Sequence, residues 1–259
     1  MKLAITGKGG VGKTTLASLL ARVFASQGRT VLAIDADPDA NLAAALGYAP
    51  EEFSKITPVS EMSELIEERT GAKPGTTGGY FKINPRVDDI PDRFSARRNG
   101  VKLLVMGGVK KGGGGCICPE SVLLRSLVNH LILYEKDVVI MDMEAGIEHL
   151  GRATASSVDA FIVVVEPGQR SFQTARSIRR LAKEIGIERT FVVGSKVMGE
   201  DDRKLVAESL PDFEVLGFLS YSSLVQRADM LGHSVYDTDP NAALEAAEIA
   251  ERLERITAL

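Results

Sequence analysis

Residues 112–120 read GGGGCICPE and contain both cysteines of the 259-residue chain, Cys116 and Cys118. In an extended segment, side chains two residues apart point the same way, so both sulfurs can face one ion. A disulfide between them would strain the geometry that such a bond needs. Pro119 fits the first position of a helix, which would place Cys118 at a helix N-terminus, where the dipole favours the metal-binding thiolate. The pair therefore predicts a site for a soft metal ion.

Two sulfurs are too few to close a soft-metal site, and three completions are open. Two copies of the chain could meet on a two-fold axis and supply four sulfurs. A histidine of the same chain (His130, His149 or His233) or a client protein could instead supply the rest. Thiolates suit Zn²⁺, Cu⁺ and iron–sulfur clusters, and four in a plane also suit Ni²⁺, so the residues alone do not choose the metal. The alternative, two inert cysteines in a surface loop, fits less well because free cysteine prefers burial.

A second group of residues could bind phosphate. Residues 7–15 read GKGGVGKTT, which matches G-x-x-x-x-G-K-[ST] between an expected strand and an expected helix. Glycines let backbone N–H groups close around phosphate oxygens, and the helix N-terminus adds its dipole. Lys13 can reach the β- and γ-phosphates, and the Thr14 hydroxyl can bind Mg²⁺. The predicted nucleotide-binding residues of the loop are Gly7, Gly9, Gly10, Val11, Gly12, Lys13, Thr14 and Thr15.

Carboxylates follow two other apolar runs. Residues 35–41 read DADPDAN, and VVIMD ends in Asp142. Acidic groups at the carboxyl ends of strands lie where α/β sheets bind ligands. One of the first group could orient the attacking water, and Asp142 could face Mg²⁺ through a water molecule. The alternative interpretation is that these carboxylates only solubilise turns.

The order of elements explains how these residues would meet. Apolar runs without polar alternation, separated by segments with helical spacing, predict strands that are buried on both faces. The expected strands are 3–6, 30–34, 101–106, 138–141, 161–165, 190–193 and 215–219, and the expected helices are 13–27, 121–134, 171–185, 201–209 and 241–256, with a further one possible at 60–69. We therefore expect an α/β fold, a single P-loop NTPase domain over residues 1–259, with a mostly parallel central sheet of about seven or eight strands and helices on both faces. Residues 48–99 interrupt the pattern and are interpreted as an insertion, either a surface excursion or a lid or docking element.

Composition narrows the function. Hydrophobic residues make up 44% of the chain and charged residues 25%, as in ordinary globular proteins, and the formal net charge is −4. The negative charge argues against non-specific binding to nucleic acid or an anionic membrane. No apolar run is long enough to span a bilayer, and the N-terminus shows no signal peptide. With two cysteines in no disulfide framework, we expect a cytoplasmic protein.

The phosphate loop, residues 7–15, also resembles a known motif. With Lys8 inside it, GKGGVGKTT resembles the deviant Walker A motif of the MinD/ParA/nitrogenase-iron-protein class of ATPases. The resemblance implies that ATP lies between two subunits and that Lys8 acts across the dimer. It also implies that Asp37, the second aspartate of D-x-D, positions the attacking water, so Lys8, Lys13 and Asp37 form the predicted catalytic set. Where that class has Asn-Lys for the base, this chain has Ser195-Lys196, and we expect these two residues to complete the nucleotide-binding set. Serine can still donate and accept a hydrogen bond, but it cannot make the two-point contact of an amide.

A narrower resemblance covers essentially the whole chain. GGGGCICPESVLLRSLVNHL, MDMEAGIEHLGRAT and VVEPGQRS are similar to the CooC-type family, the nickel-insertion accessory ATPases for carbon monoxide dehydrogenase. This implies an ATP-hydrolysing metallochaperone that forms a nucleotide- and metal-promoted homodimer and binds Ni²⁺ at Cys116 and Cys118 of both subunits. Zn²⁺ could occupy the same thiolates, and ATP and Mg²⁺ would bind at the phosphate loop. Alternatives are a nickel-insertion ATPase for acetyl-CoA synthase, or a related MinD/ParA-type ATPase with a structural zinc or iron–sulfur site.

Two other uses of the same motif fit the sequence poorly. A DNA-partition ATPase needs a basic surface, and the negative net charge of the chain argues against one. A membrane-positioning ATPase would end in a basic amphipathic helix, whereas this chain ends in NAALEAAEIAERLERITAL, which is rich in alanine and acidic residues. We therefore expect neither nucleic acid nor membrane as a partner.

Overall fold

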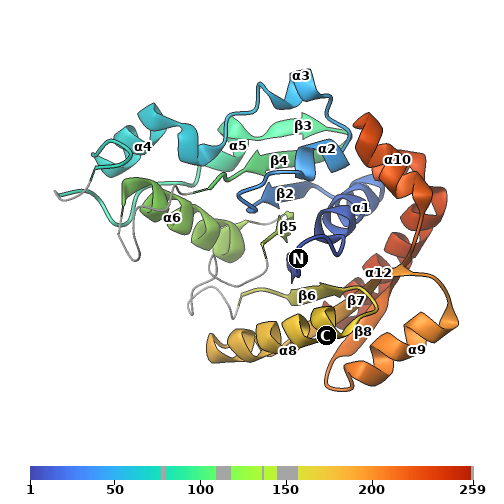
Figure 1. Cartoon of the computed structure of the whole chain (residues 1–259). Coiled ribbons are helices and arrows are strands. Elements are labelled where there is room, and N and C mark those ends of the chain that lie inside the picture. The colour runs from blue at the N-terminus through green and yellow to red at the C-terminus, as the bar shows by residue number, and fades with distance from the viewer. Residues whose placement is uncertain (77–79, 109–117, 136, 145–156, 258–259) are drawn as a thin grey trace.

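A central sheet of eight strands organises the chain (Figure 1). The computed structural model describes residues 1–76, 80–108, 118–135, 137–144 and 157–257. The strand order across the sheet is β3-β4-β2-β5-β1-β6-β7-β8. The strands are β1 (Lys2–Gly7), β2 (Val31–Asp35), β3 (Ala96–Arg98), β4 (Val101–Val105), β5 (Val138–Asp142), β6 (Ala160–Val165), β7 (Thr190–Val197) and β8 (Glu214–Ser220).

All neighbouring strands pair in parallel except β3, which runs antiparallel to β4 at one edge. Parallel neighbours need a crossover, so helices alternate with strands along the chain. The helices are α1 (Lys13–Ser26), α2 (Leu42–Ala45), α3 (Pro50–Phe53), α4 (Ser63–Thr70), α5 (Ile90–Phe94), α6 (Pro119–Tyr134), α8 (Gln169–Glu184), α9 (Glu200–Ser209), α10 (Ser223–Leu231), α11 (Val235–Thr238) and α12 (Pro240–Thr257), with a 3-10 turn at Val59–Glu61.

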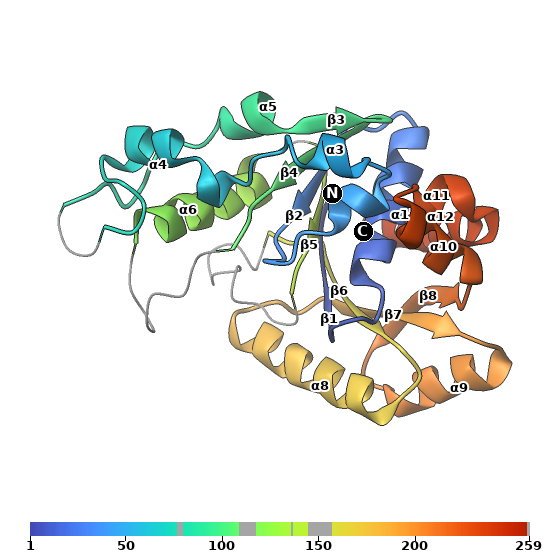
Figure 2. The ribbon, with the colours of Figure 1, turned by 45° about the horizontal axis from the view of Figure 1, so that its top comes forward.

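The sheet separates two hydrophobic cores, because successive side chains of a strand point to opposite faces. In β1, Leu3 and Ile5 pack with α1, α2 and α10–α12, whereas Ala4 packs on the opposite side with α4–α6, α8 and α9. Figure 2 shows α1 and α12 on one side of the strands and α8 on the other. The expected fold, one α/β domain with a mostly parallel sheet covered on both faces, is confirmed.

All seven expected strands are present, with ends shifted by up to a few residues, and the expected helices are found. The eighth strand, β3, was not predicted, because its three residues Ala96–Arg98 are mostly charged and carry no apolar run. α10 and α11 were also missed, since they are short and lie in a polar segment.

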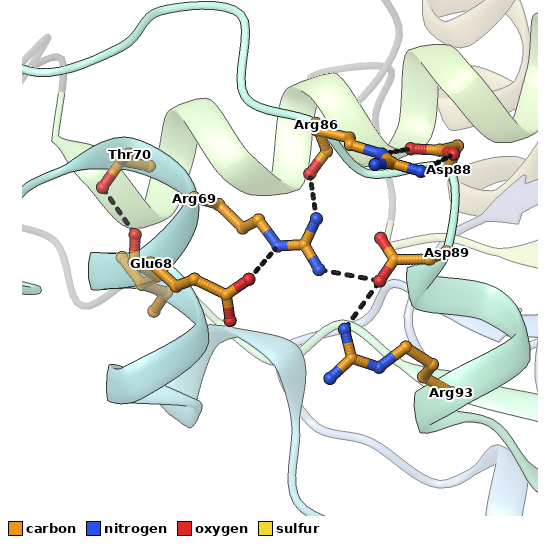
Figure 3. Close-up of polar contacts among 8 residues, drawn as sticks. Glu68, Arg69, Thr70, Arg86, Asp88, Asp89 and Arg93 are labelled. Atoms are coloured by element: carbon orange, nitrogen blue, oxygen red, sulfur yellow. Dashed lines mark hydrogen bonds and ion pairs between the residues drawn. The ribbon is translucent and has the colours of Figure 1, made fainter.

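The interpreted insertion, residues 48–99, is partly built into the domain. Arg69 at the end of α4 is only 9% exposed, and its guanidinium donates to the Asp89 carboxylate at 2.7 Å (Figure 3). Asp89 also accepts from Arg93 at 2.7 Å, and the backbone oxygen of Arg86 accepts from Arg69 at 3.4 Å. These contacts join α4 to the segment before α5 and lower the pKa of Asp89 to about 2, chiefly through the hydrogen bonds from Arg69 and Arg93. We call this group, Arg69, Asp89 and Arg93, the arginine clasp.

Candidate functional site

The predicted site lies where β1, β2, β5, β6 and β7 end. Because these strands run parallel, their carboxyl ends share one edge of the sheet. Asp35 and Asp142 stand opposite one another in the β2–β5 register. The phosphate loop follows β1 on the same edge and leads directly into α1. The sheet thus brings together residues that the sequence places more than 100 positions apart.

The phosphate loop has the backbone that its glycines predict. Gly12 precedes α1 with φ of 98°, in the left-handed region that disfavours residues with a side chain. A Cβ at Gly12 would also lie 2.9 Å from the Ser195 hydroxyl. α1 begins at Lys13, so its first N–H groups point toward the space in front of the loop. The Lys13 ammonium lies 3.5 Å from the Lys8 backbone oxygen, which folds this side chain back over the loop.

Thr14 and Asp142, the two residues predicted to bind Mg²⁺, contact each other in the structure. The Thr14 hydroxyl donates to Asp142 Oδ2 at 2.6 Å, while Oδ1, although buried, has no hydrogen-bond partner. Asp142 is 1% exposed, and its burial raises its pKa to about 6, against the opposing effects of the Thr14 hydrogen bond and the Lys13 charge. A buried carboxylate with a free oxygen beside a hydroxyl is a fitting partner for a hydrated Mg²⁺ ion, which prefers hard oxygen ligands and keeps several waters. These residues therefore fit Mg²⁺.

Asp35 and Asp37 differ in burial and in hydrogen bonding. Asp35 is fully buried and accepts hydrogen bonds from the backbone N–H of Leu42 at 2.8 Å and of Asp37 at 3.4 Å. Burial raises the pKa of Asp35 to about 7. The loop that Asp35 anchors carries Asp37, whose negative charge contributes to the raised pKa of Asp142. Asp35 therefore holds the turn that carries Asp37 through its hydrogen bonds to the backbone, a contact that the sequence analysis did not predict.

Lys8 has a neighbour that the sequence analysis did not predict. Its ammonium lies 4.0 Å from one carboxylate oxygen of Glu166, which directly follows β6. The other oxygen of Glu166 lies 3.7 Å from Lys196, whose ammonium also donates to the Gly10 backbone oxygen at 2.5 Å. The side chain of Lys8 is 39% exposed. Lys8 is therefore held at the rim of the loop, where it faces solvent. The run EPG after a buried strand was the available signal for Glu166.

Ser195 and Lys196, near the end of β7, lie next to the phosphate loop. Ser195 is 4% exposed, and its hydroxyl lies against Gly12. Both residues line a pocket that continues from Gly12 and Thr15 to Tyr221, Val225 and Gln226. These last three residues were not predicted, since they lie in the polar segment around the unpredicted α10. The structure therefore extends the candidate nucleotide site to the end of β8 and to α10.

Cys118 lies at the N-terminus of α6, with Pro119 at the first helical position, as predicted. Its backbone N–H donates to the Ser121 hydroxyl at 3.3 Å, and that hydroxyl donates back to the Cys118 oxygen at 2.9 Å. Cys116 and His149 lie outside the described residues. Within the described ranges, no three His, Cys, Asp or Glu side chains are gathered as a metal site in one subunit would require.

Comparison with known proteins decides the family. The model of the CobQ/CobB/MinD/ParA nucleotide binding domain matches residues 2–235. The chain belongs to this family. It is a P-loop ATPase of the CooC type, and the resemblance found in the sequence is confirmed.

Two relatives and one solved structure show how similar this ATPase is to known proteins. The carbon monoxide dehydrogenase accessory protein CooC of Rhodospirillum rubrum is 47% identical, over 99% of this chain and 97% of its own. An uncharacterized ATP-binding protein of Methanocaldococcus jannaschii is 48% identical, over 96% of each chain. The MinD cell division protein of Aquifex aeolicus superposes with a TM-score of 0.70 over 98% of each chain at 20% identity, which shows the shared fold. In the described parts of this ATPase, no helix is long and apolar enough to cross a membrane.

Proposed function

We propose that this ATPase is a cytoplasmic metallochaperone that binds nickel and assists its insertion into the active-site cluster of carbon monoxide dehydrogenase. The observation that carries the proposal is the 47% identity, over nearly the whole of both chains, to the carbon monoxide dehydrogenase accessory protein CooC. The C-x-C pair of Cys116 and Cys118 adds a thiolate chemistry that suits Ni²⁺ as cargo.

ATP hydrolysis would proceed at the edge of the sheet. Lys13 and the loop N–H groups would hold the phosphates, and Thr14 and Asp142 would hold Mg²⁺ with its water. Asp37, which is half-buried beside Asp142, positions the attacking water. Mg²⁺ supplies charge stabilisation for the transferring phosphoryl group when it is bound.

A second copy of the chain completes both sites in this proposal. Lys8 is exposed enough to reach the nucleotide of a partner, and Cys118 is half-buried rather than enclosed. Four thiolates on the two-fold axis would close the nickel site, because an isologous interface presents the same loop twice. The homodimer is therefore promoted by both nucleotide and metal.

A single helix–strand unit links the two sites. α6 begins after Cys118, and the chain then passes through β5 to Asp142. The helix packs through Leu123, Leu127 and Leu131, which are fully buried. Because a packed helix moves as a rigid body, a shift at the magnesium end can be transmitted to Cys118. This is the mechanical link by which hydrolysis would release the metal.

Equilibrium nickel binding with and without ATP tests the proposal. We expect roughly one Ni²⁺ per dimer for the wild type, tighter binding with ATP, and loss of binding in the Cys116→Ser, Cys118→Ser double variant. His130→Ala and His233→Ala are matched controls that should keep the stoichiometry, since four thiolates complete the site. Unchanged nickel binding in the double variant would refute the cysteine site, and loss in a histidine variant would indicate ligation within one subunit.

The client is tested separately. The nickel-loaded protein is mixed with ATP and with nickel-free carbon monoxide dehydrogenase or nickel-free acetyl-CoA synthase, and the recovered activity of each enzyme is measured. Activation of acetyl-CoA synthase alone would favour the alternative client. Anaerobic metal analysis with a visible spectrum distinguishes both from the second alternative, a related ATPase with a structural zinc or iron–sulfur site.

A further inference from the structure

The chain leaves α4 in a loop that is fixed at its base. The Lys82 N–H donates to the Thr70 carbonyl oxygen at 2.8 Å, which brings the two ends of the loop together. Thr70 is fully buried and directly follows Arg69 of the arginine clasp, so this contact ties the loop to the packed domain. We call the described parts of this loop, residues 71–76 and 80–84, the α4 loop.

The α4 loop lies against the end of α6 that follows Cys118. The Gly75 N–H lies 3.3 Å from each carboxylate oxygen of Glu120, which is in the first turn of α6 and two positions after Cys118. Figures 1 and 2 both show the chain beyond α4 beside the start of α6. The α4 loop and the proposed metal-binding cysteine therefore share one side of the domain.

The large exposed side chains of the α4 loop are apolar or cationic. Tyr80 is fully exposed and Ile83 is 67% exposed, although isoleucine is among the residues most often buried. Lys73 and Lys82 are exposed as well, and residues 71–84 contain neither Asp nor Glu. In a chain with a net charge of −4, the α4 loop is a local positive surface with two apolar side chains in it.

Two carboxylates beside the α4 loop are engaged with other groups. Glu120 faces the Gly75 N–H, and Glu68 lies 3.3 Å from the Arg69 guanidinium. Within the described part of the chain, no carboxylate forms an ion pair with either lysine of the α4 loop. Both ammonium groups are therefore free to pair with carboxylates of another protein.

Charge indicates which partner suits this surface. In the proposed dimer, a two-fold axis near Cys118 would bring the α4 loops of both copies to the same side, and their lysines would repel each other. A different protein, with carboxylates around an apolar depression, would neutralise the lysines and bury the tyrosine and isoleucine. An enzyme that receives the metal has to approach Cys118, which brings it to the α4 loop.

We infer that the α4 loop docks the client enzyme. Tyr80 and Ile83 fill an apolar depression on the client, and Lys73 and Lys82 pair with carboxylates at the rim of that depression. A central aromatic anchor with charges around it is the usual arrangement of a specific interface. The inference rests on the proposed function, because it takes the partner to be the carbon monoxide dehydrogenase that receives nickel.

Two double variants test the apolar and the charged part separately. The nickel-loaded protein is titrated with nickel-free carbon monoxide dehydrogenase in the presence of ATP, and the Kd is measured at low and at high salt. Tyr80→Ser with Ile83→Ser should raise the Kd roughly tenfold or more at both salt concentrations. Lys73→Glu with Lys82→Glu should raise it by a similar factor at low salt and by less at high salt, because salt screens exposed charges.

Matched controls come from α9, which follows β7 near the opposite edge of the sheet from β4. Lys204→Glu reverses an exposed charge, and Leu205→Ser removes an apolar side chain that is 42% exposed. Both should keep the wild-type Kd for the client. Because the α4 loop residues are exposed and outside the phosphate site, both loop variants should keep wild-type thermal melts, ATP turnover and nickel stoichiometry.

The outcomes separate this inference from the proposed function. If the wild type binds and activates the client and both loop variants do so with the same Kd, the inference is wrong and the proposed function stands. If the loop variants lose the ATP-dependent dimer in ultracentrifugation, the α4 loop is a contact between copies and the inference is also wrong. If the wild type neither binds nor activates the client, the proposed function fails and the inference fails with it.

Discussion

At the residue scale, Asp142 has the environment that bears most directly on the proposed magnesium site. It is almost completely buried, one oxygen accepts from Thr14, and the other has no protein partner. Burial raises the pKa of Asp142 to about 6, so the carboxylate is ionised at neutral pH and protonated in mild acid. Only the ionised form attracts hydrated Mg²⁺. Proton and metal therefore compete for this group.

This competition predicts a pH-dependent magnesium requirement. With a pKa near 6, the ionised fraction of Asp142 falls about tenfold between pH 7 and pH 5, and the apparent affinity for Mg²⁺ should fall by a similar factor. ATPase rates measured against Mg²⁺ concentration at pH 5, 6 and 7 give this dependence. Asp142→Asn should lower the ATPase rate by about 10- to 100-fold. In this variant, the magnesium requirement should depend on pH only through the binding of Mg²⁺ to ATP. The same pH profile in wild type and variant would contradict this assignment.

At the scale of elements, the arginine clasp gives the 48–99 segment a fixed place. Arg69 is nearly buried, and Asp89 bridges it to Arg93, so α4, α5 and the intervening chain hold one another. The nearly buried Arg69 guanidinium also pairs with Glu68 at 3.3 Å, so loss of the Asp89 charge would leave it only partly compensated. The arginine clasp therefore indicates that α4 and α5, within the interpreted insertion, are packed as part of the domain.

Removal of the Asp89 charge should destabilise the domain in a pH-dependent way. The folded pKa of Asp89, about 2, lies below its ordinary value of 3.8. Its stabilisation is therefore fully present above about pH 4 and is lost as the pH falls toward 2. We expect Asp89→Asn to lower the free energy of unfolding by about 1–3 kcal/mol at neutral pH, with the difference from wild type shrinking between pH 4 and 2.

Denaturant unfolding at several pH values measures this difference. Asp88→Asn is the matched control, because Asp88 pairs with Arg86, whose side chain is 74% exposed, and exposed pairs contribute little. Equal destabilisation by the two substitutions would mean that the clasp has no special role.

At the scale of the whole molecule, the proposed dimer depends on Lys8. The Lys8 side chain lies near Glu166 at the rim of the loop and is 39% exposed. Reaching a partner's phosphates would exchange this loose ion pair for a contact with several negative oxygens, which favours the dimer only when ATP is present.

Lys8→Ala should therefore abolish ATP-dependent dimerisation and lower ATP turnover by roughly 1000-fold or more, by analogy with an arginine supplied in trans to a phosphoryl transfer. Analytical ultracentrifugation with and without ATP, together with phosphate release, measures both effects. Lys204→Ala, at an exposed position of α9, should behave as wild type. Full turnover and ATP-dependent dimers in the Lys8 variant would rule out a role in trans.

Sequence alone determined the features that depend on contiguous residues. The phosphate loop, the buried strands and the helix that begins after Cys118 each follow from local composition, because glycine conformation, apolar runs and a proline at a helix start act over a few residues. The order of these elements was enough to predict the layered α/β fold.

Only the tertiary structure decided which distant side chains meet. Glu166 beside Lys8, Gln226 beside the phosphate loop and Asp89 beside Arg69 come from elements that carry no mutual signal in the sequence. The sequence analysis missed strand β3 for a related reason. Its three residues have no apolar pattern and form a strand only because they pair with β4. Such contacts depend on how the sheet aligns its strand ends, which is a property of the packed chain and not of any short segment.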